Sequence, residues 1–186
     1  MTQKKIAVVV GSLRKESWNR KIAKELIALA PPIMKMEFVE IGDLPLYNED
    51  LETNTPPAAW TEFRSAIGAS DGILFFTPEY NRTIPGALKN AIDVGSRPYG
   101  SSVWQGKPGA VISVSPGAIG AFGANHVLRQ SMVFLGVPML PHEAYIGAVS
   151  SLFDENGVLA DSTKGFLSKF VTQYEDWINR FPGEGK

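Results

Sequence analysis

Small hydroxyl and amide side chains and one arginine follow a short apolar run, Ile6–Val10, near the amino terminus, and a helical pattern comes next. The N-terminus of a helix offers free backbone N–H groups and the positive end of the helix dipole, and both favour a phosphate dianion. An arginine adds a charge-assisted, bidentate contact. The sequence therefore predicts a site for a terminal phosphate. The residues with suitable donors are Ser12, Arg14, Ser17 and Asn19.

This phosphate turn matches neither of the common nucleotide-binding patterns. The chain contains no G-x-x-x-x-G-K-[ST] loop and no G-x-G-x-x-G fingerprint. Ser17 or Asn19 alone would equally serve as an ordinary helix N-cap. Capping requires no arginine, so Arg14 is the residue that favours phosphate binding.

A second unusual loop follows another apolar run, Gly72–Thr77. Prolines at 78 and 85 and a glycine at 86 give it an irregular path, which leaves backbone donors and acceptors without ladder partners. Tyr80 supplies a flat ring, and Asn81 supplies both a donor and an acceptor. A flat heteroaromatic ring with imide edges needs these features. The alternative is an ordinary strand-to-helix connection, with Pro85 at the start of the helix. Such a connection would explain the prolines but not Tyr80 and Asn81.

A third loop, Ser115–Gly123, follows the apolar run that begins at Gly109. Its glycines lie three positions apart, which is not dinucleotide spacing, and small residues allow a backbone to approach a ligand closely. A flexible turn before a helix would have the same composition. Its assignment to a binding site is supported by its expected position beside the other two loops.

Five strand patterns and five helical patterns alternate along the chain, which predicts an α/β fold with helices on both faces of an open, doubly wound parallel sheet. For a chain of 186 residues the flavodoxin-like order 2-1-3-4-5 is expected, with ligands at the carboxyl ends of the strands, near the switch between strands 1 and 3. The three loops should therefore converge. The predicted strands are Lys5–Val10, Met36–Ile41, Gly72–Thr77, Gly109–Ser115 and Met139–Tyr145. The helical patterns span about 22–30, 60–67, 86–96, 127–135 and 166–178.

Length and composition are those of a single globular domain, residues 1–186. The net charge of −1 gives no basic excess for nucleic acid or an anionic membrane. The first apolar run is too short for a signal peptide or a membrane span, so we expect a cytoplasmic protein. The long segments 42–57 and 98–107 are candidates for lids or partner contacts, and Trp104 is a candidate interface residue.

Side chains that could carry a reaction by themselves are scarce. The chain has no cysteine, and neither of its two histidines, His126 and His142, has a partner at metal-ligand spacing. No G-x-S-x-G nucleophile elbow occurs. We therefore expect no metal and no catalytic side chain, and such a protein takes its chemistry from a cofactor.

These motifs resemble the NADPH-dependent FMN reductases, and within them the bacterial chromate and quinone reductases. The resemblance extends from about Ile6 to the last helix and is weaker after Gly147, and the segment 148–161 carries no usable motif. The matching residues are Gly11–Arg14 with Ser17 and Asn19, Pro78–Asn81, Ile84–Gly86 and Leu88–Asp93.

The resemblance implies a flavodoxin-like fold with tightly bound FMN, which takes hydride from NAD(P)H at N5 and passes it to oxidants such as quinones and chromate. It also implies a homodimer or homotetramer. Ser12, Arg14, Ser17 and Asn19 would hold the FMN phosphate. Pro78, Glu79, Tyr80 and Asn81 would line the flavin ring, and Ser115, Gly117 and Gly120 would close its other side. Arg82 and Arg97 are candidates for binding nucleotide phosphates, and each is equally a candidate for a plain surface charge.

Other functions stay open on the sequence alone. A flavodoxin-type electron carrier would share the fold, but acidic carriers usually show a strong negative excess, which this chain lacks. A free-flavin or azo-dye reductase would share the site, as would a non-enzymatic module that binds a phosphate ligand or a nucleotide. The preference between NADH and NADPH and the physiological acceptor also stay open.

Overall fold

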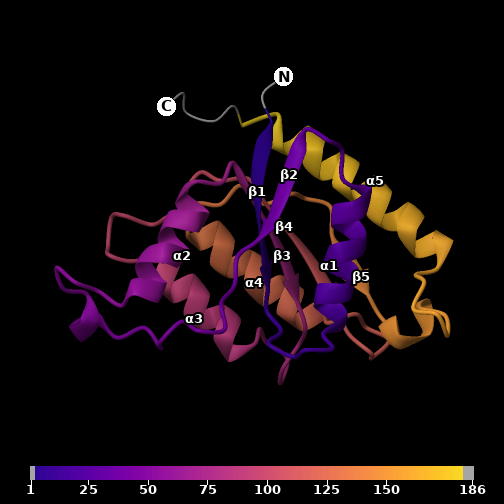
Figure 1. The fold of residues 1–186 in the computed structure, drawn as a ribbon, viewed down its shortest axis with the longest axis horizontal. Coiled ribbons are helices and arrows are strands. Elements are labelled where there is room, and N and C mark those ends of the chain that lie inside the picture. The colour runs from indigo at the N-terminus through magenta and orange to yellow at the C-terminus, as the bar shows by residue number, and fades with distance from the viewer. Residues whose placement is uncertain (1–2, 182–186) are drawn as a thin grey trace.

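The computed structural model describes residues 3–181, in which five parallel strands form one sheet in the order β2-β1-β3-β4-β5 (Figure 1). The predicted flavodoxin-like order is confirmed. Strands β3 and β4 are buried along their whole length, as their continuous apolar runs predict. The strands are β1 Lys4–Val10, β2 Met34–Phe38, β3 Gly72–Thr77, β4 Gly109–Val114 and β5 Ala144–Ile146.

Helices cover both faces of the sheet. Helices α1 and α5 pack on one face, and α2, α3 and α4 pack on the other (Figure 1). Successive side chains of β1 enter opposite cores, because side chains alternate along a strand: Val8 joins the α1/α5 side and Val9 the other. The helices are α1 Trp18–Leu29, α2 Ala58–Gly68, α3 Gly86–Gly95, α4 Phe122–Phe134 and α5 Asp161–Ile178. Two short 3₁₀ helices lie at Glu49–Leu51 and Val149–Leu152.

The two outer strands differ from their predicted bounds. Strand β2 begins two residues early and ends at Phe38, although Val39 still donates to the carbonyl of Val8 at 2.9 Å. Met139 forms only an isolated bridge with Gly109. Pro141 follows, and because proline has no N–H it cannot continue a ladder. The strand proper therefore starts at Ala144.

The prediction of Trp104 as an interface residue is wrong. Its side chain is fully buried, and its indole N–H donates to the carbonyl of Ile92 at 3.0 Å. The ring packs against Phe63 and Phe75. A side-chain carbon at Gly95 would lie 2.5 Å from the indole, so this glycine makes room for it. The loop at 98–107 thus inserts a core residue.

The segment 42–57 is tied to the helices beside it. The side-chain carbonyl of Asn90 accepts from the N–H of Tyr47 at 2.8 Å, and its amide donates to the carbonyls of Leu44 and Pro45. Farther along, Arg64 forms a bidentate ion pair with Glu52 at 2.7 and 2.8 Å. Within residues 3–181, no helix is both long enough and apolar enough to cross a membrane.

Candidate functional site

The three predicted loops converge at the carboxyl ends of β1, β3 and β4, which are neighbours in the sheet. Between them lies a pocket of about 110 Å³. A second hollow of about 400 Å³ adjoins it, and Arg14 and Tyr80 line both. The smaller pocket is lined by Ser12, Arg14, Trp18, Asn19, Pro78, Glu79, Tyr80, Val114, Ser115 and Pro116. The larger hollow is lined by Gly11, Leu13, Arg14, Tyr80, Pro85, Gly86 and Ala87.

Ser17 caps helix α1, as the plain interpretation of this residue predicts. Its hydroxyl oxygen accepts the backbone N–H of Arg20 at 3.2 Å, and the residue is buried and lines neither hollow. The N–H groups of Trp18 and Asn19, the first two of the helix, find no acceptor among residues 3–181. Free N–H groups at a helix start are an anion-binding arrangement.

Asn19 carries a buried polar atom without a partner. Its amide nitrogen donates to the carbonyl of Val114 at 3.3 Å, which fixes the orientation of the amide. Its side-chain oxygen is buried and has no donor among the described residues. A buried acceptor left without a donor costs about 1–3 kcal/mol. A ligand that brings a hydroxyl group to this point would satisfy it.

Arg14 is an exposed cation that makes no hydrogen bond or ion pair with any of residues 3–181. Other arginines are engaged: Arg20 pairs with Glu40, and Arg64 pairs with Glu52. The guanidinium of Arg14 therefore borders both hollows with its donors available. That is the arrangement the phosphate prediction requires.

The second loop turns back on itself at Tyr80–Thr83. The N–H of Tyr80 donates to the carbonyl of Thr83 at 2.9 Å, and the reverse bond is 3.0 Å long. Asn81 and Arg82, the two central residues, have φ angles of 52° and 65°. This left-handed conformation is uncommon for residues other than glycine, and such strain is often found at functional sites. The turn leaves the ring of Tyr80 half exposed between the two hollows.

Glu79 lines the pocket as predicted, but its carboxylate contacts protein groups. One oxygen accepts the backbone N–H of Ala124 at 3.1 Å, and the other lies 3.2 Å from the guanidinium of Arg82. Glu79 thereby joins the second loop to the start of α4. The guanidinium of Arg82 is thus held by Glu79, although the Arg82 side chain is 75% exposed.

In the third loop, Ser115 borders the pocket, and its hydroxyl accepts the N–H of Gly117 at 2.9 Å. Gly120 is buried behind the loop with a φ of 60°. A side-chain carbon there would lie 3.0 Å from the backbone nitrogen of Ile146. Its role is therefore to shape the loop, because neither it nor Gly117 lines the pocket.

One predicted residue lies apart from the site. Arg97 follows the C-terminus of α3, which runs from the carboxyl end of β3 back toward the start of β4. Within this chain Arg97 is therefore at the opposite edge of the sheet, where its guanidinium contacts Ser96. Asn81 stands in the turn beside the pocket without lining it. Lys89 and Asp93, four positions apart on α3, form an ion pair at 2.7 Å.

Trp18 was missed as a pocket residue. It follows the N-cap of α1 and borders the small pocket, and its ring packs on Phe153 with 5.4 Å between ring centroids. Its position between Ser17 and Asn19 was the available signal. The described residues contain no group of three potential metal ligands.

Residues 4–150 match the model of a family described as NADPH-dependent FMN reductase. The chain belongs to this family. A quinone reductase from Pseudomonas putida is 63% identical over 174 residues, covering 93% of this chain and 94% of the relative. A 2-hydroxy-1,4-benzoquinone reductase from a Burkholderia species is 46% identical over 176 residues, covering 94% and 96%. The solved structure of FerB, a flavoenzyme NAD(P)H:(acceptor) oxidoreductase from Paracoccus denitrificans, aligns with a TM-score of 0.88 and 42% identity over 96% and 98%.

This family member is an oxidoreductase that uses FMN, with NAD(P)H as co-substrate. The residues present fit that cofactor. A phosphate monoester suits the N–H groups at the start of α1 and the guanidinium of Arg14, which is exposed and makes no ion pair within residues 3–181. The ribityl hydroxyls offer the donor that the side-chain oxygen of Asn19 lacks. Backbone N–H groups of Ala118 and Ile119, which have no acceptor among residues 3–181, suit the polar edge of a flavin ring.

Proposed function

We propose that this protein reduces quinones with NAD(P)H through bound FMN. The observation that carries the proposal is the meeting of three loops around one pocket, at which Arg14 makes no hydrogen bond or ion pair with any of residues 3–181. The names of the Pseudomonas putida and Burkholderia relatives support quinones as the acceptor class. Chromate, which accepts electrons without needing a specific pocket, is a further acceptor under this proposal.

In this proposal the protein binds and orients, while FMN, when bound, supplies hydride transfer between NAD(P)H and the acceptor. The helix start and the cation near it hold the phosphate, and the second and third loops enclose the ring. No side chain acts as a nucleophile or metal ligand. The phosphate residues are Ser12, Arg14, Ser17 and Asn19. The proposed ring residues are Pro78, Glu79, Tyr80, Asn81 and Ser115, with Gly117 and Gly120 shaping the third loop that closes the other side of the ring.

The 400 Å³ hollow beside Tyr80 is the proposed place for the co-substrate and then the acceptor. A shared place requires the oxidised nucleotide to leave before the quinone enters. Arg82 lies two positions after Tyr80, which lines this hollow, and is proposed to contact a nucleotide phosphate. Its guanidinium is exposed, and among residues 3–181 it pairs only with Glu79. Arg97 lines neither hollow of this chain, which favours Arg82 for this contact.

We further propose that the single domain, residues 1–186, assembles as a homodimer or homotetramer in the cytoplasm. Exposed apolar side chains support self-association, because burying them against a second copy of the chain removes apolar surface from water. Tyr99 is 94% exposed and Phe134 is 88% exposed. The cytoplasm is supported by the co-substrate, which cells keep in that compartment. Light scattering after size-exclusion chromatography measures the assembly.

Colour and acceptor kinetics test the function. The purified protein should be yellow, and NADPH or NADH should bleach it rapidly without oxygen. Re-oxidation by 1,4-benzoquinone should then exceed that by an azo dye or free FMN in kcat/KM, with chromate measured alongside. A colourless protein that takes up no FMN would overturn the proposal. Slow bleaching would indicate a flavodoxin-type carrier instead.

A further inference from the structure

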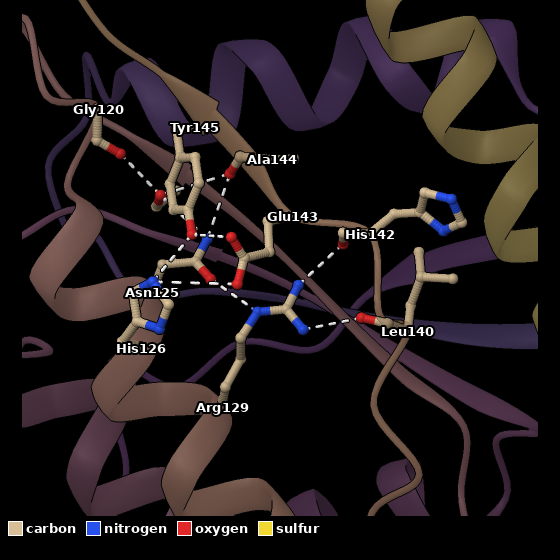
Figure 2. Close-up of polar contacts among 10 residues, drawn as sticks. Gly120, Asn125, His126, Arg129, Leu140, His142, Glu143, Ala144 and Tyr145 are labelled. Carbon is tan, nitrogen blue, oxygen red and sulfur yellow. Dashed lines mark hydrogen bonds and ion pairs between the residues drawn. The ribbon is translucent and has the colours of Figure 1, made fainter.

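A chain of buried polar groups connects the third loop to α4 and to the start of β5 (Figure 2). The hydroxyl of Ser113, on β4, lies 2.7 Å from the carbonyl of Gly120. The amide nitrogen of Asn125, on α4, donates to the hydroxyl oxygen of Ser113 at 3.1 Å and to the carbonyl of Ala144 at 3.2 Å. Ser113 and Asn125 are fully buried.

Arg129, at one end of this network, determines which groups in it donate and which accept. Arg129 donates from Nε to the side-chain oxygen of Asn125 at 2.9 Å, and guanidinium groups have no acceptor. The amide nitrogen of Asn125 must therefore face Ser113. Because that nitrogen donates to the hydroxyl oxygen, the single proton of Ser113 is left for a carbonyl. The carbonyl of Gly120, at 2.7 Å, is a nearer acceptor than that of Ala144, at 3.4 Å. The other guanidinium nitrogens donate to the carbonyls of Leu140 and His142 at 2.7 and 2.9 Å.

The end point of the network is the strained part of the third loop. Gly120 and Ala121 have φ angles of 60° and 59°, so two successive residues are left-handed. The hydrogen bond from Ser113 holds the carbonyl of Gly120 inward. The N–H groups of Ala118 and Ile119, which find no acceptor in the described part of the chain, directly precede this point. Without Ser113 the buried carbonyl would lose its donor, and the loop would shift to regain one.

We propose that Ser113, Asn125 and Arg129 are positioning residues that hold the loop 115–120 in the shape that binds the flavin ring. None of the three lines either hollow, so they act through Gly120. The inference rests on the proposed function, because it assigns the third loop to the ring and not to the phosphate.

The test compares FMN with riboflavin, which has the ring and lacks the phosphate. Ser113→Ala removes the donor to Gly120, and we expect the Kd of both ligands to rise about tenfold, the usual effect of one net hydrogen bond. Tyr174→Phe is the matched control. It removes another buried hydroxyl, which donates to the carbonyl of Pro108 at 3.1 Å. Pro108 directly precedes β4 and lies at the amino-terminal end of this strand, away from the pocket. The control should lower Tm and leave both Kd values within twofold.

A second variant covers the case in which Ser113→Ala fails to fold. Arg129→Met removes the partly exposed end of the network, and both Kd values should rise together by a smaller factor. Unchanged binding of both ligands, or a loss confined to FMN, would overturn the inference while leaving the function intact. A wild-type protein that binds neither ligand would instead overturn the proposed function.

Discussion

The carboxylate of Glu79 accepts a hydrogen bond from the backbone N–H of Ala124, 45 positions later in the chain, at 3.1 Å. Ala124 is the third residue of α4, and the N-cap of this helix, Ala121, has no side chain that could cap it. A carboxylate from a different loop therefore caps α4. The same contact fixes the second loop of the pocket against the helix that follows the third.

Glu79→Gln should destabilise the protein by about 1 kcal/mol, because the amide keeps an acceptor but loses the charge that favours a helix N-terminus. In a chain of this length that corresponds to a Tm about 2–4 °C lower. Thermal unfolding measures it. Glu62→Gln changes an exposed carboxylate on α2 and is the control. Equal Tm values for the two variants would show that the charge of Glu79 contributes nothing to capping α4.

Much of the fold could be predicted because its signals are local. The runs that form β1, β3 and β4 are continuous and apolar, which is typical of strands covered on both faces. The edge strands carry weaker signals. Strand β5 pairs over only three residues, and the proline at 141 excludes the earlier part of the predicted segment.

The sequence predicted which loops form the site, but it did not predict the contacts that hold those loops in place. Ser12, Arg14 and Asn19 meet Tyr80 and Ser115 because parallel strands bring their ends together. The contact of Glu79 with α4 joins residues far apart in sequence, and no local pattern encodes it. Trp104 was misassigned for the same reason, since a tryptophan in a polar loop gives no sign of the core it enters.

Arg14→Ala should weaken FMN binding by about 1.5–3 kcal/mol, the usual contribution of a hydrogen bond to a charged group. The Kd for FMN should thus rise roughly 10–100-fold. Riboflavin, titrated in parallel, should bind both proteins alike. Lys15→Ala is the matched control, because Lys15 is a neighbouring exposed cation that does not line either hollow. An equal loss for the two ligands would assign Arg14 to folding.

Asn19→Leu should separate stability from binding. The substitution removes a buried oxygen without a partner, which offsets the loss of the bond to Val114. We expect the Tm of the FMN-free protein to change by no more than about 2 °C. The rise in Tm on adding FMN should shrink, because the ligand no longer satisfies that oxygen. A full ligand-induced rise would show that Asn19 does not contact the cofactor.

Tyr145 should ionise late in an alkaline titration. Its hydroxyl donates to the carboxylate of Glu143 at 2.6 Å, and burial together with that carboxylate raises the pKa of Tyr145 from 10.0 to about 12. The folded state thus favours the neutral phenol. Its contribution to stability is fully present below pH 10 and is lost as the pH rises from about 10 to about 12.

The tyrosinate absorbance of wild type minus that of Tyr145→Phe isolates this group. The difference should rise with a midpoint near pH 12. Subtraction is needed because burial also raises the pKa of Tyr174 well above its ordinary value. Glu143→Gln removes the neighbouring charge, so in that background the pKa of Tyr145 should move down toward 10.0. A wild-type midpoint near pH 10 would contradict the contact between Tyr145 and Glu143.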